Sequence, residues 1–198
     1  MGRRRAFDAE SVVAAARDLF WQRGYELTSI GDLEAHTGLD RSSLYNAFGS
    51  KQALFEAALR SYLSEGIETR LRGLRQPDAG LETLTAFFAG MAANFRGDPE
   101  RAVFGCLMVN SLGELGAHSG PTQSALARAY RDSFREAFRN ALGQAAARGE
   151  IGIEQVEARS KLLAATVMGL FVSARIDPLD AADVCDSVAA EVAGWKRA

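Results

Sequence analysis

The stretch TSIGDLEAHTGLDRSSLYNAFGSK, residues 28–51, decides how this chain folds. Ser29 is typical of a helix cap, because a serine oxygen accepts a hydrogen bond from an otherwise unpaired backbone N–H. Gly38 is typical of a helix end, where a left-handed backbone favours glycine. Asp40 then caps a second helix whose apolar residues are four apart. The stretch therefore predicts two short helices joined by a tight turn.

The second of these helices has a polar outer face that lacks carboxylates. At about 100° per residue, Leu44, Ala47 and Phe48 share one arc. The rest of the surface is covered by Arg41, Ser42, Ser43, Tyr45 and Asn46. An arginine, an amide and small hydroxyls suit a helix laid in the DNA major groove, where such groups contact base edges. Taken alone, the helix is equally compatible with the solvated face of an ordinary helical hairpin.

The segment resembles the DNA-binding domain of the TetR family of transcriptional repressors. The run LYNAFGSK (44–51) matches the family's Leu-Tyr-x-x-Phe-x-x-Lys signature, and further matches are RGY (23–25), TSI (28–30) and the apolar pair LF (54–55). The match is confined to the amino-terminal part of the chain, and the remainder agrees in length and helical character. Glu34, His36 and Thr37 stand where many members have small alanines, which bears on local helix packing.

This resemblance implies a DNA-binding domain over residues 1–50 and a ligand-binding and dimerisation domain over residues 51–198. It implies a homodimeric repressor on a palindromic operator, with its two reading helices about 34–36 Å apart. A small molecule bound in the carboxyl-terminal domain is expected to release the DNA. Four side chains are candidates for base edges: Arg41, Ser42, Ser43 and Asn46. Four are expected to position the helix on phosphates: Thr28, Ser29, Tyr45 and Lys51.

Charge and composition are those of an ordinary globular chain. The 198 residues are 47% hydrophobic and 24% charged, with a net charge of −2. Basic residues are nevertheless placed usefully: Arg3, Arg4 and Arg5 form an arm, and Arg41 and Lys51 bracket the reading helix. Such a local rim suffices to neutralise phosphates. No apolar run reaches about 18 residues and no signal-peptide core follows the basic start, so a cytoplasmic protein without membrane spans is expected.

The whole chain is predicted to be all-α. Apolar residues recur at helical spacing, glycine and proline fall between the segments, and no strand pattern appears. The helices outside the paired segment are expected over residues 9–23, 51–74, 81–95, 102–114, 122–148, 156–176 and 180–195.

The second half of the chain is rich in aromatic and methionine residues. For any single residue, core packing is the simpler explanation. Together with the family resemblance, the set predicts a cavity for an apolar, aromatic or amphipathic effector. The residues assigned to it are Phe87, Phe88, Met91, Phe95, Phe104, Cys106, Phe134, Phe138, Met168 and Phe171.

The last two helices carry more apolar surface than one core can cover. A four-helix interface between two copies would bury it. The residues assigned to this homodimer interface are Leu162, Leu170, Val172, Val188, Val192 and Trp195.

The two cysteines leave one alternative open. Cys106 follows Gly105 at a predicted helix start, where the helix dipole lowers a thiol pKa. The alternative prediction is therefore a repressor that senses oxidants or electrophiles through this thiol. Burial among apolar neighbours is the competing interpretation, and Cys185 is assigned to the core. Neither cysteine has metal-ligand spacing, and no catalytic residues, metal site or cofactor are predicted. An enzyme, or a helical small-molecule-binding protein without DNA function, is the remaining alternative; the histidines, His36 and His118, do not favour the enzyme.

Overall fold

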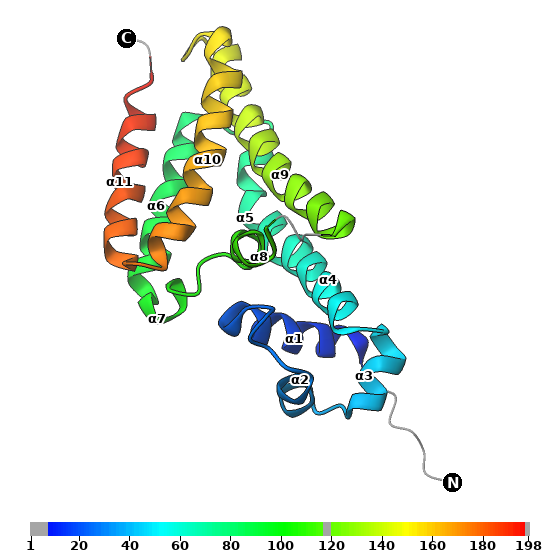
Figure 1. Cartoon of the computed structure of the whole chain (residues 1–198). Helices are drawn as coiled ribbons and strands as arrows, with labels where there is room; N and C mark the ends of the chain where they lie inside the picture. The colour runs from blue at the N-terminus through cyan, green and yellow to red at the C-terminus, as the bar shows by residue number, and fades with distance from the viewer. Residues whose placement is uncertain (1–7, 117–119, 197–198) are drawn as a thin grey trace.

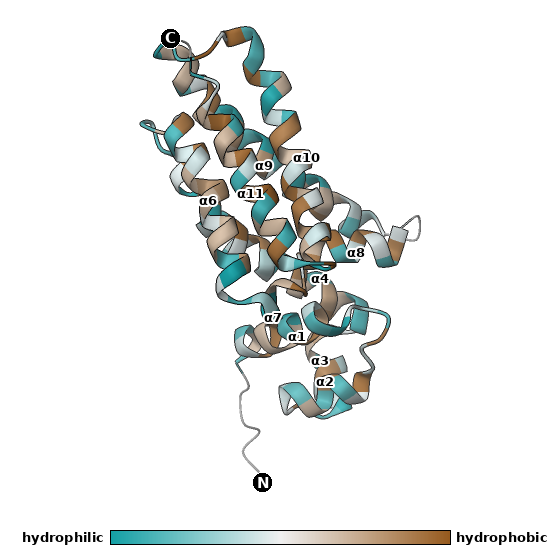
Figure 2. Cartoon of the chain, turned by 90° about the vertical axis from the view of Figure 1, so that its left-hand side faces the viewer, coloured by the Kyte–Doolittle hydropathy of each residue, from teal (hydrophilic) through white to brown (hydrophobic). Residues whose placement is uncertain are grey.

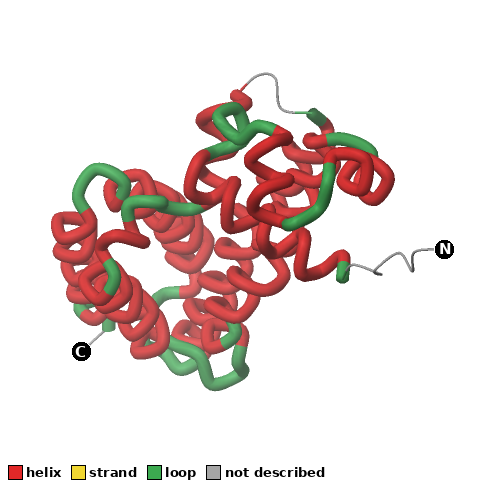
Figure 3. Tube along the Cα trace, turned by 90° about the horizontal axis from the view of Figure 1, so that it is seen from below, coloured by secondary structure: helices red, strands yellow, loops and turns green. Residues whose placement is uncertain are grey.

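The computed structural model describes residues 8–116 and 120–196 of the chain. These residues form helices and connecting loops with no strand among them, as Figure 3 shows, so the all-α prediction is confirmed. The helices are α1 (Ala9–Arg23), α2 (Ile30–Thr37), α3 (Arg41–Phe48), α4 (Lys51–Ser61), η1 (Tyr62–Ile67), α5 (Glu68–Leu71), η2 (Gly73–Arg75), α6 (Leu81–Gly97), α7 (Pro99–Ala102), α8 (Leu107–Leu115), α9 (Pro121–Ala147), η4 (Ile153–Gln155), α10 (Val156–Ala174) and α11 (Pro178–Ala193). The basic arm with Arg3, Arg4 and Arg5 lies outside the described residues, as does His118.

Helices α2 and α3 begin at the capping residues that the sequence predicts, and α2 also ends at its predicted glycine. Ser29 Oγ accepts a hydrogen bond from Asp32 N at 3.1 Å, and the Asp32 carboxylate accepts one from Ser29 N at 2.9 Å. Gly38 closes α2 with a left-handed φ of 72°. Asp40 Oδ1 then accepts from Ser43 N at 2.7 Å and so caps α3. Helices α2 and α3 lie at the end of the molecule opposite the carboxyl terminus (Figures 1 and 2).

The single helix expected over residues 51–74 is interrupted. After α4, the η1 segment is π-helical, and Glu68 N donates to the carbonyl of Leu63, five residues earlier. A regular α-helix would place Tyr62 and Ile67 about 140° apart around its axis, because each residue turns it by about 100°. The wider π turn lets both side chains enter the core, where they are 5% and 1% exposed. Burial of these two side chains therefore overrides the local sequence pattern, which favours a regular α-helix.

The carboxyl-terminal part of the chain is a bundle in which α11 packs along α6 and α10 along α9 (Figure 1). Its centre holds the rings of Phe88, Phe134 and Phe138, all at most 1% exposed. The Phe138 ring lies 6.0 Å from each of the other two, stacked on Phe88 and tilted against Phe134. Burial of these rings supplies the main favourable free energy of the bundle.

The helix expected over residues 102–114 begins later than predicted. The short helix α7 ends at Ala102, a turn follows, and α8 starts at Leu107. Gly105 makes this turn with a φ of 63°, a conformation that L side chains rarely adopt. A Cβ at this position would also lie 2.9 Å from the carbonyl oxygen of Phe171. The backbone of the turn therefore packs directly on α10.

Gly105→Ala is expected to lower the free energy of unfolding by about 2–4 kcal/mol, because left-handed strain adds to steric overlap. The matched control is Gly113→Ala in α8, where a Cβ meets no atom within 4 Å. That change should be neutral or stabilise the chain by up to about 1 kcal/mol, since alanine favours helices. Urea denaturation of both variants measures the difference, and equal stabilities would contradict the role assigned to this turn.

Candidate nucleic-acid interface and cavity

Helix α3 presents its polar side chains on one exposed face. Arg41, Ser42, Tyr45 and Asn46 are exposed, while Leu44 on the opposite side is 4% exposed and packs into the core. The phenol ring of Tyr45 is 45% exposed. Ser43, also a candidate for base edges, is half-buried, and its backbone N–H is used by the Asp40 cap. The shape and polarity of this face fit a helix that enters the major groove.

An acidic residue of α2 holds the start of α3. Glu34 Oε1 accepts from Arg41 N at 2.6 Å, and Glu34 Oε2 lies 3.8 Å from Arg41 Nε. This pair joins the two helices of the hairpin. Sequence analysis marked Glu34 only as a departure from the family pattern. Its role depends on the turn that brings α2 against the first turn of α3, which the residue types alone do not specify.

The four residues expected to contact phosphates have different surroundings. Tyr45 and Ser29 are exposed, and Lys51 Nζ lies 4.2 Å from the ring centroid of Tyr25, a cation–π contact at the start of α4. Thr28 is fully buried, and its Oγ1 donates to the carbonyl of Gly24 at 2.6 Å. Its side chain fastens the chain between α1 and α2 and is not presented at the surface. The phosphate contact predicted for Thr28 therefore does not fit its position.

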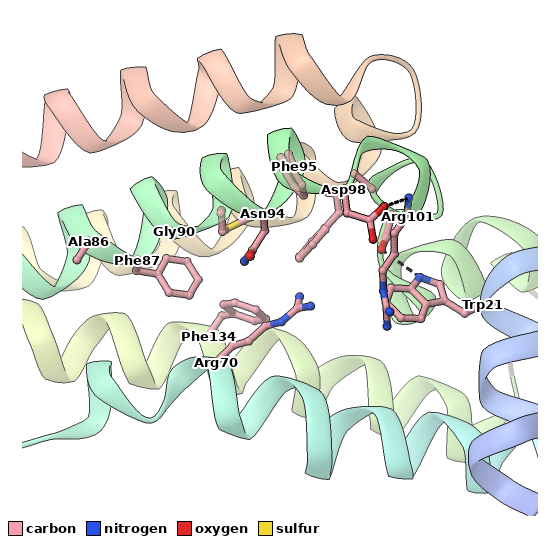
Figure 4. A pocket seen from close by; sticks show the side chains of 14 residues that line it. Trp21, Arg70, Ala86, Phe87, Gly90, Asn94, Phe95, Asp98, Arg101 and Phe134 are labelled. Atoms are coloured by element: carbon pink, nitrogen blue, oxygen red, sulfur yellow. Dashed lines mark hydrogen bonds between the residues drawn. The ribbon is translucent and has the colours of Figure 1, made fainter.

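A cavity of about 500 Å³ opens between α6 and the helices that face it (Figure 4). This volume falls in the range of small-molecule sites. Its walls are formed by Trp21, Arg70, Ala86, Phe87, Gly90, Met91, Asn94, Phe95, Asp98, Arg101, Ala102, Gly105, Phe134 and Phe171.

Five of the ten residues assigned to an effector site lie on these walls: Phe87, Met91, Phe95, Phe134 and Phe171. The other five do not. Phe88, Cys106 and Phe138 are fully buried in the protein core, and Phe104 and Met168 are half-buried outside the cavity. Residues of both groups lie one helical turn apart, as Phe134 and Phe138 do on α9. The sequence pattern therefore does not distinguish residues of the cavity wall from residues of the core.

The polar wall residues were missed by sequence analysis. Arg70, Asn94, Asp98 and Arg101 look like the ordinary solvated side of a helix in the sequence, and only the packing turns them toward the cavity (Figure 4). Trp21 offered a signal, since a tryptophan beside the inward stripe of α1 is a large apolar surface that needs a partner.

Trp21 connects the amino-terminal helices to the cavity. Its Nε1 donates to the carbonyl of Gly105 at 3.1 Å, and Arg101 Cζ lies 5.0 Å from its ring centroid. A second link lies nearby, where Tyr25 N donates to Glu114 Oε2 of α8 at 2.7 Å. The α7–α8 region is thus bonded to α1 and to the turn that follows α1.

The thiol of Cys106 lies in a buried polar cluster with the phenol groups of Tyr62 and Tyr130. Its Sγ is within hydrogen-bond distance of Tyr130 Oη, at 3.2 Å, and both residues are fully buried. Burial raises the pKa of Tyr130 and of Tyr62 well above the ordinary value for a phenol, so both stay neutral. Because a sensing thiol needs solvent access, the alternative of an oxidant-sensing repressor through Cys106 is not favoured.

Neither cysteine of the folded chain should react quickly with Ellman's reagent. Cys185 is also fully buried, and burial raises its pKa to about 12, so the thiolate is scarce at neutral pH. Both thiols should titrate at once in guanidinium chloride. A variant with one exposed thiol, Ala129→Cys, is the positive control. Rapid labelling of the folded wild-type chain would show that the Cys106 cluster opens readily.

The residues assigned to the dimer interface are divided between surface and core. Leu162 and Val172 are 60% and 49% exposed on α10, whereas Leu170 and Val192 are buried within the protomer. Val188 on α11 and Trp195, just after the end of α11, are half-buried. Along α10 and in the turn after it, exposed small and apolar residues follow the three-and-four spacing of one helix face: Leu162, Ala165, Gly169 and Val172 on α10, and Ile176 in the turn.

Two other kinds of feature were sought along residues 8–116 and 120–196. No group of three or more His, Cys, Asp or Glu side chains is placed to hold a metal ion. None of the described helices combines the length and the apolar character that crossing a membrane requires.

Comparisons with known proteins agree with this geometry. Residues 12–58 match the family model of bacterial regulatory proteins of the TetR family, and residues 80–190 match a tetracyclin repressor-like carboxyl-terminal domain. The chain is 32% identical over 176 residues to the transcriptional repressor ComR of Escherichia coli strain K12, covering 88% of this chain and 82% of ComR. It is 33% identical over 157 residues to the uncharacterized regulator YezE of Bacillus subtilis strain 168, covering 79% of each. A cysteine mutant of the regulator CifR, solved with a 26-base-pair double-strand operator DNA, superposes with a TM-score of 0.75 at 29% identity, covering 99% of this chain and 100% of that one. The chain therefore belongs to the TetR family and is a DNA-binding transcriptional regulator.

Proposed function

We propose that the protein represses transcription as a homodimer on a palindromic operator and that a small molecule in the cavity releases the DNA. One observation carries the proposal: Trp21, on α1 of the DNA-binding helices, forms part of the wall of a cavity that otherwise belongs to the bundle. A bound molecule would contact both parts of the chain at once. Its binding free energy would therefore depend on how the two parts are placed relative to each other.

The DNA contacts follow from α3. Arg41, Ser42 and Asn46 are exposed along one face and are assigned to base edges, with Ser43 at the margin of that face. Tyr45 and Lys51, together with Ser29 at the start of α2, are assigned to phosphates. The complex of CifR with operator DNA supports this placement, because the two chains are similar along nearly their whole length. The reading unit corresponds to residues 1–50 and the regulatory unit to residues 51–198.

Release of DNA follows from the elements that join the units. Helix α4 packs against α1 and continues through η1 into α5, which carries Arg70 on the cavity wall. The bonds of Trp21 to Gly105 and of Tyr25 to Glu114 form a second path. An effector that moves either path would change the distance between the two copies of α3, which must match the spacing of the half-sites.

The dimer is assigned to α10 and α11. The exposed stripe runs along α10 from Leu162 and ends at Ile176 in the turn after it. Helix α10 packs against α11, on which Val184 is 41% exposed. Two copies of this surface related by a two-fold axis would form a four-helix interface. Leu170 and Val192 support the interface from within the protomer core. The family is one of regulators, so we assign the chain no enzymatic role, and its site of action is the cytoplasm, with the operator DNA.

The experiment is an affinity measurement with DNA from upstream of the chain's own coding sequence. Fluorescence anisotropy of labelled duplexes should show specific binding, with a loss of affinity as salt rises. A shuffled duplex of the same composition is the control. Equal affinity for both duplexes at every salt concentration would sink the proposal of a specific operator there.

A further inference from the structure

The cavity is not purely apolar. Two arginines and one aspartate lie on its walls, so its formal charge is positive. The aspartate, Asp98, already accepts a hydrogen bond from the backbone N–H of Arg101 at 3.0 Å as the cap of α7. Arg101 in turn lies over the Trp21 ring. Of the charged groups on the walls, this leaves Arg70 to be accounted for.

Arg70 reaches into the cavity from α5. Figure 4 shows its guanidinium beside the ring of Phe134, with the side chain of Asn94 on the facing wall formed by α6. None of the ion pairs formed by residues of the described ranges includes Arg70. A guanidinium is a rigid fork of donors that matches a carboxylate or sulfonate with two parallel hydrogen bonds.

Arg70 is exposed, and its guanidinium faces the open cavity. A molecule in this cavity would take away part of the water around the guanidinium. A neutral ligand would give no partner in exchange, which costs free energy. An anion would replace the lost water by charge-assisted hydrogen bonds. The remaining wall favours a ring system, since Phe87 and Phe134 meet edge to face with centroids 6.4 Å apart and Phe95 and Phe171 do so at 6.2 Å.

We infer that the effector is an amphipathic organic anion: an aromatic body between the phenylalanine rings and an anionic head on Arg70, with the Asn94 amide opposite. The inference rests on the proposed function and narrows it. It also places the charged contact on α5, which α4 and η1 join to the reading helices. The sequence predicted an effector cavity from its aromatic and methionine residues, and Arg70 adds a cation to the walls of the cavity.

Two fluorescent probes with the same aromatic body test the inference. The anion 1-anilinonaphthalene-8-sulfonate carries a sulfonate that neutral N-phenyl-1-naphthylamine lacks. The full-length wild-type protein should bind the anion about tenfold more tightly, the size of effect expected from charge-assisted hydrogen bonds. Arg70→Gln should weaken the anion about tenfold and leave the neutral probe within about twofold. Arg72→Gln, an exposed change two residues away, should alter neither.

A blocking variant keeps the two proposals separable. Gly90 lies on the cavity wall with open space around its Cβ position, so Gly90→Phe should fill the cavity without straining the fold. If this change abolishes binding of both probes while Arg70→Gln leaves the anion unaffected, the site stands and the anionic effector is wrong. If Gly90→Phe leaves both probes bound, the cavity is not the site and the proposed release mechanism fails with it. Retained binding of the neutral probe by Arg70→Gln also shows that this variant is folded.

Discussion

Arg41→Ala should weaken operator binding by about 5- to 150-fold and relax base preference, the range expected for loss of one bidentate base contact. The side chain stands exposed at the start of α3, where a helix in the major groove meets base edges. Its Nε lies 3.8 Å from Glu34 Oε2, so a contact of the guanidinium with a base would have to replace this ion pair. Lys51→Ala, at the start of α4, should weaken every duplex alike and reduce the salt slope by about one.

Fluorescence anisotropy on operator and shuffled duplexes at several salt concentrations distinguishes the two effects. Arg131→Ala is the matched control, because this arginine pairs with Asp132 on the exposed side of α9. Its loss should change neither affinity nor salt slope. If both Arg41→Ala and Lys51→Ala bind the operator like wild type, the assignment of α3 as the reading helix is wrong.

Val172→Glu should convert the dimer into a monomer and lower operator affinity on the order of 100-fold or more, because a lone subunit loses the avidity of two half-sites. Val172 is 49% exposed and is the last residue of the stripe that lies on α10 itself. In a two-fold interface each substitution occurs twice, so two carboxylates would be brought together in an apolar contact. The protomer itself should remain folded, since the side chain is not part of its core.

Sedimentation velocity at micromolar concentration measures the first effect and anisotropy the second. Ala129→Glu places the same charge on an exposed position of α9 and should leave the protein dimeric. A stable monomer for the wild-type chain would refute the homodimer. A dimer that survives Val172→Glu would move the interface away from the α10 stripe.

Local chemistry explains what the sequence predicts well. Caps such as Ser29 and Asp40 act within a few residues, so the ends of the short helices are readable without the fold, and the structure confirms them. The π turn at η1 and the bend at Gly105 were not predicted. Both depend on contacts with distant residues: the core around Tyr62 and Ile67, and the α10 backbone at Phe171. The spacing of apolar residues along one helix does not predict contacts with residues that are distant in the sequence.

For the candidate sites too, the parts built from one helix could be predicted from the sequence, and the parts built from several helices could not. The exposed face of α3 could be predicted because one helix supplies all of it. The cavity needs side chains from several helices, and a phenylalanine on its wall can lie one helical turn from one in the core, as Phe134 and Phe138 on α9 illustrate. Arg70 and Trp21 join the wall only through the packing of α5 and α1. The roles of these residues in binding therefore remain predictions.

The π turn between α4 and α5 acts as a one-residue insertion in an otherwise continuous rod. Removing one residue from the segment 62–67 would return it to a regular helix. Because a π turn takes up about one residue more than an α turn, the flanking helices would keep nearly the same angular phase. Deleting a residue from a regular α-helical part of the rod would instead turn one end against the other by about 100°. For anyone building a chimaera that joins this bundle to the reading head of a relative, angular phase is the quantity to conserve. Two parents whose lengths differ by this one residue can therefore still join in phase.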